Sequence, residues 1–214
     1  MLAPDRIASI LKALDESYPN AECALTHRSP WELLVATILS AQCTDVRVNM
    51  VTPELFRRFP PPQKMTKATL PQIEALIRTT GFFHNKAKSI QGAARKVVAE
   101  FGGQVPQTLA ELITLPGVAR KTANVVLGVC FGKAKGVVVD THVFRISRRL
   151  GLAKGEPPEK IEQELMRILP QSRWIGVSHQ IIHHGRQLCE ARKPKCDRCN
   201  LEPLCTAKDK TWRS

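Results

Sequence analysis

A proline–glycine turn followed at once by a helix is the feature that most constrains how this chain folds. It lies in the stretch from Leu115 to Asp140, which reads LPGVARKTANVVLGVCFGKAKGVVVD. Pro116 has a fixed φ angle and Gly117 adopts backbone conformations that other residues avoid, so the pair favours a tight turn. The segment before the turn also has helical spacing, which predicts a helical hairpin over about residues 108–131.

The helix after this turn carries two basic residues in its first turn. Arg120 and Lys121 lie at the positive end of the helix dipole, where cations are normally disfavoured. Unpaired backbone N–H groups at the same end suit a phosphate, and a bound anion would remove the electrostatic conflict. From the residues alone, an ordinary hairpin with two solvated cations is the alternative.

The net charge of the chain indicates a polyanionic partner. Its 32 Lys and Arg residues exceed its 19 Asp and Glu residues, giving a formal net charge of +13, a surplus typical of nucleic-acid binding. Hydrophobic residues make up 43% of the chain, which is ample for a packed core. No uncharged apolar stretch approaches the roughly 18 residues that a membrane helix needs. We therefore expect a protein of the cytoplasm, nucleoid-associated if bacterial, with no membrane association. We also expect it to be a monomer.

Helical periodicity dominates the chain and predicts an all-α fold. Trp31 to Leu39 is apolar around the whole axis, which predicts a helix buried in the core. Pro53 is expected to interrupt the helical pattern that follows. Gly136 to Asp140 is the only run with strand character, and it is too short to build a sheet. Asp140 is well placed as the N-cap of a helix over residues 141–150.

Polar residues appear abruptly where the buried helix ends. Gln42 and Asp45 are therefore expected at a surface or cleft. A simple helix end followed by a cap at Thr44 or Asp45 explains the same residues.

A turn further along the chain carries two adjacent aromatic residues. Phe82 and Phe83 cannot both easily face a core, so one of them is a candidate wedge at the surface. A loop whose phenylalanines cover the core is the alternative. The helix expected after this turn has four basic residues predicted to face outward: Lys86, Lys88, Arg95 and Lys96. A basic face that is simply solvated explains these residues equally well.

Four of the seven cysteines crowd the C-terminal region. Cys189, Cys196, Cys199 and Cys205 are separated by six, two and five residues. Four soft thiolate ligands in one compact loop predict a metal site. The uneven spacing favours an iron–sulfur cluster over structural zinc, which commonly uses two short-spaced pairs, but zinc stays open. Basic residues surround the loop and predict contacts with a phosphate backbone: Arg186, Arg192, Lys193, Lys195 and Arg198.

Taken together, these features resemble the endonuclease III family, the helix-hairpin-helix DNA glycosylases with AP lyase activity. The resemblance runs over nearly the whole chain. It is carried by SAQCTD at Ser40 to Asp45, LPGVARKTANVV at Leu115 to Val126, VDTHVFR at Val139 to Arg145, and the four-cysteine pattern. In this family the four cysteines carry a 4Fe-4S cluster, so the resemblance implies that cofactor.

The resemblance also implies an architecture and a reaction. Residues 23–135 would form a helical barrel domain with the hairpin, and residues 1–22 with 136–214 a cluster domain, with a DNA-binding cleft between the two. Lys121 would be the nucleophile and Asp140 its carboxylate partner. The implied substrate is damaged double-stranded DNA, from which an oxidised pyrimidine is removed before β-elimination through a Lys121 Schiff base.

Matching the motifs position by position implies a set of DNA contacts. These are Gln42, Asp45, Phe82, His84, Lys86, Gly117, Ala119, Arg120, Thr122, His142 and Arg145. The chain departs from the family pattern at Phe82, where an aliphatic residue is common, and at Ala119, where a second glycine is usual. Two alternatives stay open: an adenine mismatch glycosylase, and a non-catalytic iron–sulfur protein that binds DNA or senses redox state.

Overall fold

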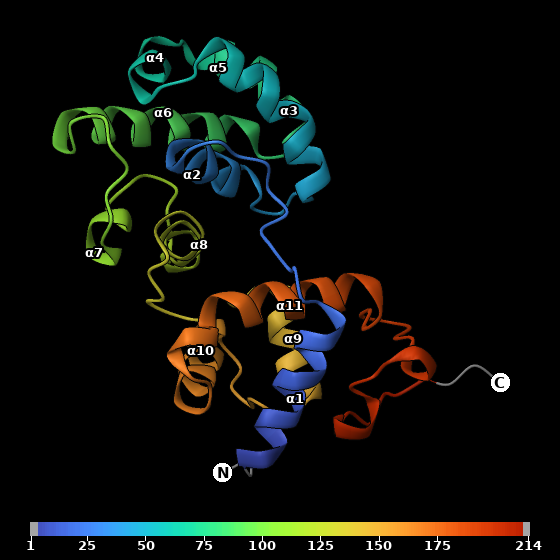
Figure 1. Cartoon of the computed structure of the whole chain (residues 1–214). Coiled ribbons are helices and arrows are strands. Elements are labelled where there is room, and N and C mark those ends of the chain that lie inside the picture. Colours follow the sequence, from blue (N-terminus) through green and yellow to red (C-terminus); the bar gives the residue numbers. More distant parts are fainter. Residues whose placement is uncertain (1–3, 212–214) are drawn as a thin grey trace. The chain divides into compact units, whose positions relative to one another are not determined.

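The protein was analysed as a computed structural model that describes residues 4–211. Within these residues there is no strand, so the all-α prediction is confirmed (Figure 1). The helices are α1 (Pro4–Ser17), α2 (Pro30–Leu39), α3 (Asp45–Arg58), α4 (Pro62–Lys67), α5 (Leu70–Ile77), α6 (Phe83–Glu100), α7 (Leu109–Leu112), α8 (Arg120–Phe131), α9 (Thr141–Arg149), α10 (Pro158–Ile168) and α11 (Trp174–Gln187). None of the helices described combines the length and apolar character needed to cross a bilayer.

Two compact units make up the chain, and each is described by itself. One is continuous in sequence and consists of residues 23–135. The other combines residues 1–22 with residues 136–214, so it draws on both ends of the chain.

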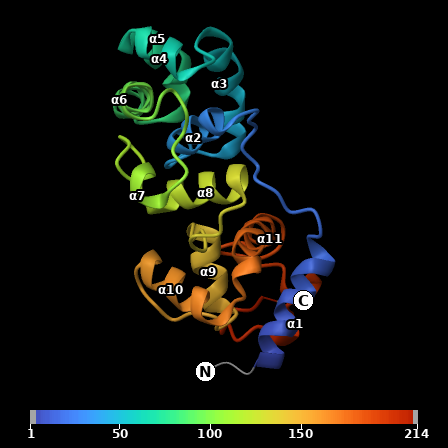
Figure 2. The same cartoon turned by 60° about the vertical axis from the view of Figure 1, so that its left-hand side comes forward.

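Helix α2 is the centre of the continuous unit. All residues from Trp31 to Leu39 are buried, as the apolar sequence predicts. The helix packs against α3, α6 and α8, and it lies between α6 and α8 in both views (Figures 1 and 2). Each fully buried leucine or isoleucine of this core stabilises the fold by about 1.5–3 kcal/mol relative to an exposed one.

The starts of several helices in this unit follow the capping signals in the sequence. The Ser29 side chain accepts a hydrogen bond from the backbone of Glu32 at the start of α2. Thr69 and Gln72 form the expected capping box of α5. The side chain of Thr108 accepts from the backbone of Glu111 at the start of α7. These side chains satisfy backbone donors that the first helical turn leaves unpaired.

One local prediction in the chain was wrong. Pro53 does not interrupt α3, which runs through it from Asp45 to Arg58. Packing of α3 against α2 and α5, with Leu55 and Phe56 buried after the proline, outweighs the lost hydrogen bond. Residues 136–139 form no strand, and Val137 and Val139 instead contribute single side chains to the core of the other unit.

The discontinuous unit is built on α9 and α11, which pack together, with α1 against α11 and α10 against α9. Polar contacts fasten α1 to segments from the other end of the chain. Arg6 donates hydrogen bonds to the carbonyl oxygens of Leu150, at 2.7 Å, and Leu204, at 2.6 Å. Asp15 accepts two hydrogen bonds from Arg173, at 3.0 and 2.5 Å. The first helix is thus an integral part of this unit.

Candidate active site

The proline–glycine turn connects a very short helix to a long one. Helix α7 has only four residues, and α8 begins at Arg120. The turn is closed by a hydrogen bond from the backbone N–H of Val118 to the carbonyl of Leu115, at 3.1 Å. Gly117 has a φ of +77°, which is the left-handed conformation that the sequence predicted for it. Ala119 has a φ of −91°, so its methyl group is tolerated where the family pattern has glycine.

Gly117 also lies against α6, which makes it difficult to replace. A Cβ atom at this position would lie 2.6 Å from Cβ of Ser89. We expect Gly117→Ala to lower the free energy of unfolding by about 2–4 kcal/mol, because left-handed strain and this clash add. Gly132→Ala is the matched control, since Gly132 has a φ of +63° but open space around the added Cβ. Its expected cost is strain alone, about 1–2 kcal/mol. If urea unfolding gave the same loss of unfolding free energy for Gly117→Ala and Gly132→Ala, the close packing of Gly117 would be contradicted.

The first turn of α8 presents backbone donors and positive charge together. Among residues 4–211, no side chain caps the start of this helix. Arg120 and Lys121 are exposed, while Thr122 is buried with 7% of its surface exposed, which leaves its backbone as the group suited to an anion. Uncapped amides at the positive end of a helix form a ready site for a phosphate. The anion site at Arg120 and Lys121 stays a prediction, to which this local geometry is suited.

Asp140 is the N-cap of α9, as predicted. Its Oδ1 accepts hydrogen bonds from the backbone N–H groups of His142, at 2.9 Å, and Val143, at 2.8 Å. Within residues 4–211, its second oxygen, Oδ2, accepts none. One oxygen of the half-buried carboxylate thus fixes the side chain at the helix start, and the other is available for chemistry.

Gln42 and the candidate wedge Phe82 are both exposed, and both have strained backbones. Gln42 and Phe82 are the only non-glycine residues with positive φ in the described part of the chain, at 52° and 47°. Phe82 is 65% exposed, whereas its neighbour Phe83 is half-buried against the core, so one of the two phenylalanines faces solvent as predicted. Such strain persists only where the surrounding structure enforces it, and it clusters at functional sites.

Two other predicted contacts lie beside these residues. Asp45 is half-buried and opens α3, whose N-cap is Thr44. The exposed His84 follows Phe82 on α6, and its Nδ1 lies 2.9 Å from a carboxylate oxygen of Glu74.

The prediction that Lys86 faces outward and contacts DNA was wrong, because the residue is buried. Only 5% of the surface of Lys86 is exposed. Its ammonium group donates hydrogen bonds to the carbonyl oxygens of Leu39, at 2.8 Å, and Thr80, at 2.7 Å. The first turn of α6 packs against the end of α2, so the position faces the core although Lys88, two residues later, is exposed. This lysine does not offer its charge to a phosphate.

Arg145 and His142 are engaged inside the discontinuous unit. The Arg145 guanidinium lies 3.2 Å from Nδ1 of His142, and it donates to the carbonyl oxygen of Cys189 at 2.8 Å. Both residues are half-buried. The prediction of DNA contacts did not anticipate this link between α9 and the cysteine-containing segment.

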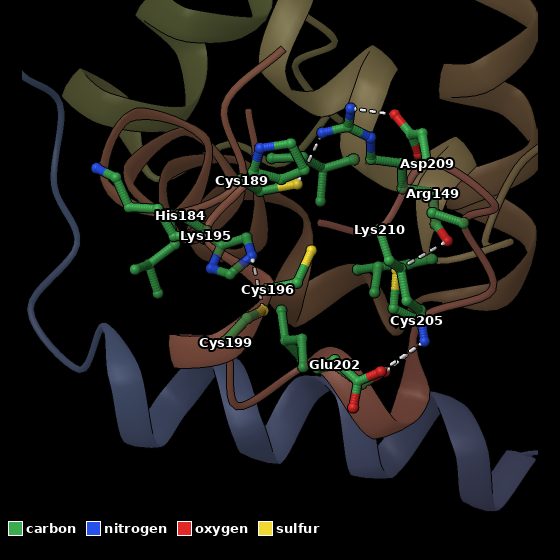
Figure 3. A pocket seen from close by; sticks show the side chains of 16 residues that line it. Arg149, His184, Cys189, Lys195, Cys196, Cys199, Glu202, Cys205, Asp209 and Lys210 are labelled. Atoms are coloured by element: carbon green, nitrogen blue, oxygen red, sulfur yellow. Dashed lines mark hydrogen bonds and ion pairs between the residues drawn. The ribbon is translucent and has the colours of Figure 1, made fainter. Parts of the chain in front are cut away.

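The four predicted metal ligands surround one pocket. The lining includes Cys189, Cys196, Cys199 and Cys205, together with Arg149, Lys195 and Lys210 (Figure 3). Among the residues described, no three Cys, His, Asp or Glu side chains are grouped closely enough to hold a single metal ion. The four cysteines, spread over residues 189–205, line the same pocket, and their role as metal ligands stays a prediction.

Nitrogen groups lie next to three of the four sulfur atoms. Arg149 donates from Nη1 to Sγ of Cys189 at 3.3 Å, and the backbone N–H of Thr211 donates to Sγ of Cys196 at 3.4 Å. Nε2 of His184 lies 3.6 Å from Sγ of Cys199 (Figure 3). Sequence reasoning missed Arg149 and His184, because neither belongs to the cysteine motif.

Burial controls the protonation of His184. Burial and the nearby Arg145 lower the pKa of His184 to about 4, so its imidazole is neutral at neutral pH. Burial, followed by the charges of Cys199 and Cys189, raises the pKa of Tyr18, whose hydroxyl lies 3.1 Å from Nδ1 of His184. With Tyr18 donating to Nδ1, the remaining proton is on Nε2 and faces the sulfur of Cys199. The chain Tyr18–His184–Cys199 thus ends on a predicted ligand.

Comparisons with known proteins agree with the resemblance inferred from the motifs. The family model described as HhH-GPD superfamily base excision DNA repair protein matches residues 35–171. Endonuclease III of Synechocystis sp. is 57% identical over 200 residues, which cover 94% of this chain and 91% of that protein. Endonuclease III of Escherichia coli (strain K12) is 40% identical over 201 residues, covering 94% and 95%.

A solved structure is similar over almost its full length. It is described as a trapped endonuclease III–DNA covalent intermediate in an estranged-adenine complex, with a TM-score of 0.91 and 42% sequence identity. The match covers 96% of this chain and 97% of that chain. A non-covalent endonuclease III–DNA complex matches with the same TM-score and 41% identity.

The short helix, the left-handed glycine turn and the uncapped helix α8 define a helix-hairpin-helix DNA repair protein. The chain belongs to the endonuclease III family of the HhH-GPD superfamily. It is an enzyme of base excision repair, a DNA glycosylase/AP lyase, and the resemblance inferred from its motifs is confirmed.

Proposed function

We propose that Lys121 is the nucleophile of a bifunctional reaction on damaged double-stranded DNA. The observation that carries this proposal is the exposed Lys121 in the first turn of an uncapped helix. An amine can attack C1′ of the damaged nucleotide, expel the base and form an imine, which a hydroxyl group could not do. One of the similar solved structures is a trapped covalent intermediate of endonuclease III with DNA, which supports covalent chemistry.

The imine then allows strand cleavage. Loss of a proton from C2′ produces an electron pair that the protonated imine accepts, and the bond to the 3′ phosphate breaks by β-elimination. The attack begins from the neutral form of the amine. Asp140 stabilises the positive charge that develops on the sugar, through the carboxylate oxygen that does not cap α9.

The target nucleotide must leave the base stack before its C1′ is reached, which costs a few kcal/mol. Gln42 and Phe82 are the side chains suited to this step, since both are exposed on strained turns. Gln42 would occupy the vacated space, and Phe82 would insert beside it. The remaining predicted contacts, including Gly117, Ala119 and Thr122 at the hairpin, would hold the phosphate backbone. The proposed substrates are oxidised pyrimidines such as thymine glycol, and abasic sites.

The cysteines fit the 4Fe-4S cluster that the endonuclease III family carries. Cys189, Cys196, Cys199 and Cys205 would hold it, and N–H donors of the kind found beside three of their sulfur atoms stabilise metal-bound thiolates. When bound, such a cluster fixes the loop and undergoes one-electron redox changes. Arg192, Lys193 and Arg198 are exposed around the loop, where they are available to DNA phosphates.

Metal analysis tests the cluster proposal. Protein purified without oxygen should contain about four iron atoms per chain and acid-labile sulfide, rather than one zinc. Cys199→Ser should lower the iron content and the visible absorbance. Cys130→Ser is the matched control, because Cys130 lies in the other unit and should keep the wild-type iron content. Stoichiometric zinc with no sulfide would overturn the assignment.

The two relatives described above are bacterial proteins, and we propose that this protein acts as a monomer in the cytoplasm. Borohydride trapping on duplexes that carry thymine glycol or an abasic site tests the catalytic proposal. We expect a covalent adduct on both substrates. An adduct on abasic DNA alone would support the lyase activity and refute thymine glycol as a substrate. Tight binding without any adduct would refute the covalent mechanism.

A further inference from the structure

The buried Lys86 connects two segments that are far apart in sequence. Its ammonium group binds the carbonyl of Leu39, the last residue of α2, and the carbonyl of Thr80, the last residue of the 3₁₀ turn Arg78–Thr80. No carboxylate in the part of the chain that is described pairs with this ammonium. A buried charge is costly unless polar groups satisfy it, and here backbone carbonyls at two helix ends do so.

The position of these two carbonyls is the second observation. Gln42 follows Leu39 by three residues, and Phe82 follows Thr80 by two. Gln42 and Phe82 are also the two non-glycine residues with left-handed backbones among residues 4–211. A left-handed conformation is unfavourable for residues with a side chain, so the surrounding structure must hold the backbone of each turn in place. The Lys86 ammonium is a shared anchor for both turns.

We propose that Lys86 is a positioning residue that holds the Gln42 turn and the Phe82 turn in fixed register, so that both side chains enter the duplex together. This inference rests on the proposed function, in which Gln42 and Phe82 contact DNA. Lys86 itself touches neither the substrate nor the reacting atoms. Its effect is therefore confined to steps that require insertion into a duplex.

A comparison of two substrates separates positioning from general stabilisation. Base removal from a lesion duplex requires insertion, whereas β-elimination at an abasic site in a short single strand requires only the amine and its carboxylate partner. We expect Lys86→Met, which keeps the length but removes the charge, to reduce the single-turnover rate on the lesion duplex about 100-fold. On the single strand, its rate should stay within roughly twofold of wild type.

Three further variants make the test specific. Lys86→Arg keeps a charged donor and should recover most of the duplex rate. Lys64→Met removes the same charge from an exposed lysine of α4 and should leave both rates unchanged. In a Gln42→Ala/Phe82→Ala background, Lys86→Met should cause no additional loss of the duplex rate, because the two side chains that Lys86 positions are already absent.

Several outcomes would overturn the proposal. These are equal losses on the two substrates, no loss on the duplex, or a full additional loss in the Gln42→Ala/Phe82→Ala background. If Lys86→Met does not fold, Lys86→Gln, which keeps one N–H donor, is tested on the same pair with the same expectation of a duplex-selective loss. Failure of the proposed function is distinguishable, because wild type itself would then fail to turn over the lesion duplex or both substrates.

Discussion

Lys121→Gln should give a folded protein that still binds abasic duplex DNA but neither cleaves it nor forms a borohydride-trapped adduct. The Lys121 side chain is exposed and makes no hydrogen bond within the described residues, so its replacement should change the free energy of unfolding by less than about 0.5 kcal/mol. Glutamine keeps much of the length of lysine but has no nucleophilic amine. The rate of strand cleavage should fall on the order of 10⁴-fold or more.

Lys135→Gln is the control for the loss of charge. Lys135 is exposed just beyond the end of α8, and no role in the reaction is assigned to it. Trapping and cleavage should be unchanged in this variant, with at most a small loss of affinity at low salt. Strand cleavage that persists at the wild-type rate in Lys121→Gln would remove Lys121 from the mechanism.

Asp140→Asn should nearly abolish base removal while leaving the fold intact. The amide oxygen of asparagine can still accept the hydrogen bonds from His142 and Val143, and asparagine is about as good an N-cap as aspartate. The change therefore removes the carboxylate charge without removing the cap. We expect single-turnover base excision to fall roughly 10²- to 10³-fold, the scale of losing one electrostatic contact to the transition state.

Asp140→Ala separates the two roles of this residue. It removes the cap as well as the charge, so the free energy of unfolding should fall by about 1 kcal/mol, whereas base excision should match that of Asp140→Asn. Urea unfolding and single-turnover excision measure the two quantities. Normal excision by Asp140→Asn would show that the carboxylate charge is not needed.

Features set by local residue preferences could be read from the sequence. Asp140 caps the helix that it was predicted to cap, and Ser29 and Thr69 are caps of the same local kind, because a cap depends on a few neighbouring residues. The left-handed Gly117 and the buried helix α2 followed from local rules too. The resemblance to the endonuclease III family supplied the assignment of roles to Lys121 and Asp140.

Features that depend on packing could not be read in the same way. Lys86 was expected to face solvent, because nothing local indicates that α2 and the 78–80 turn would present carbonyl oxygens to its ammonium. Arg149 belongs to α9, and only the tertiary fold brings it to the sulfur of Cys189. Helix α3 passes through Pro53 because its neighbours hold it there. In each case a partner distant in sequence decides the outcome.

The contacts of Arg6 constrain the order in which the two units can fold during protein synthesis. Residues 23–135 are contiguous, so this unit can fold as soon as it leaves the ribosome, whereas α1, made first, must wait for its partners Leu150 and Leu204. The helix that carries Lys121 is therefore complete before the unit that holds Asp140 and the four cysteines can close. A chain terminated before Leu204 lacks one of these partners, so closing the second unit depends on nearly complete translation.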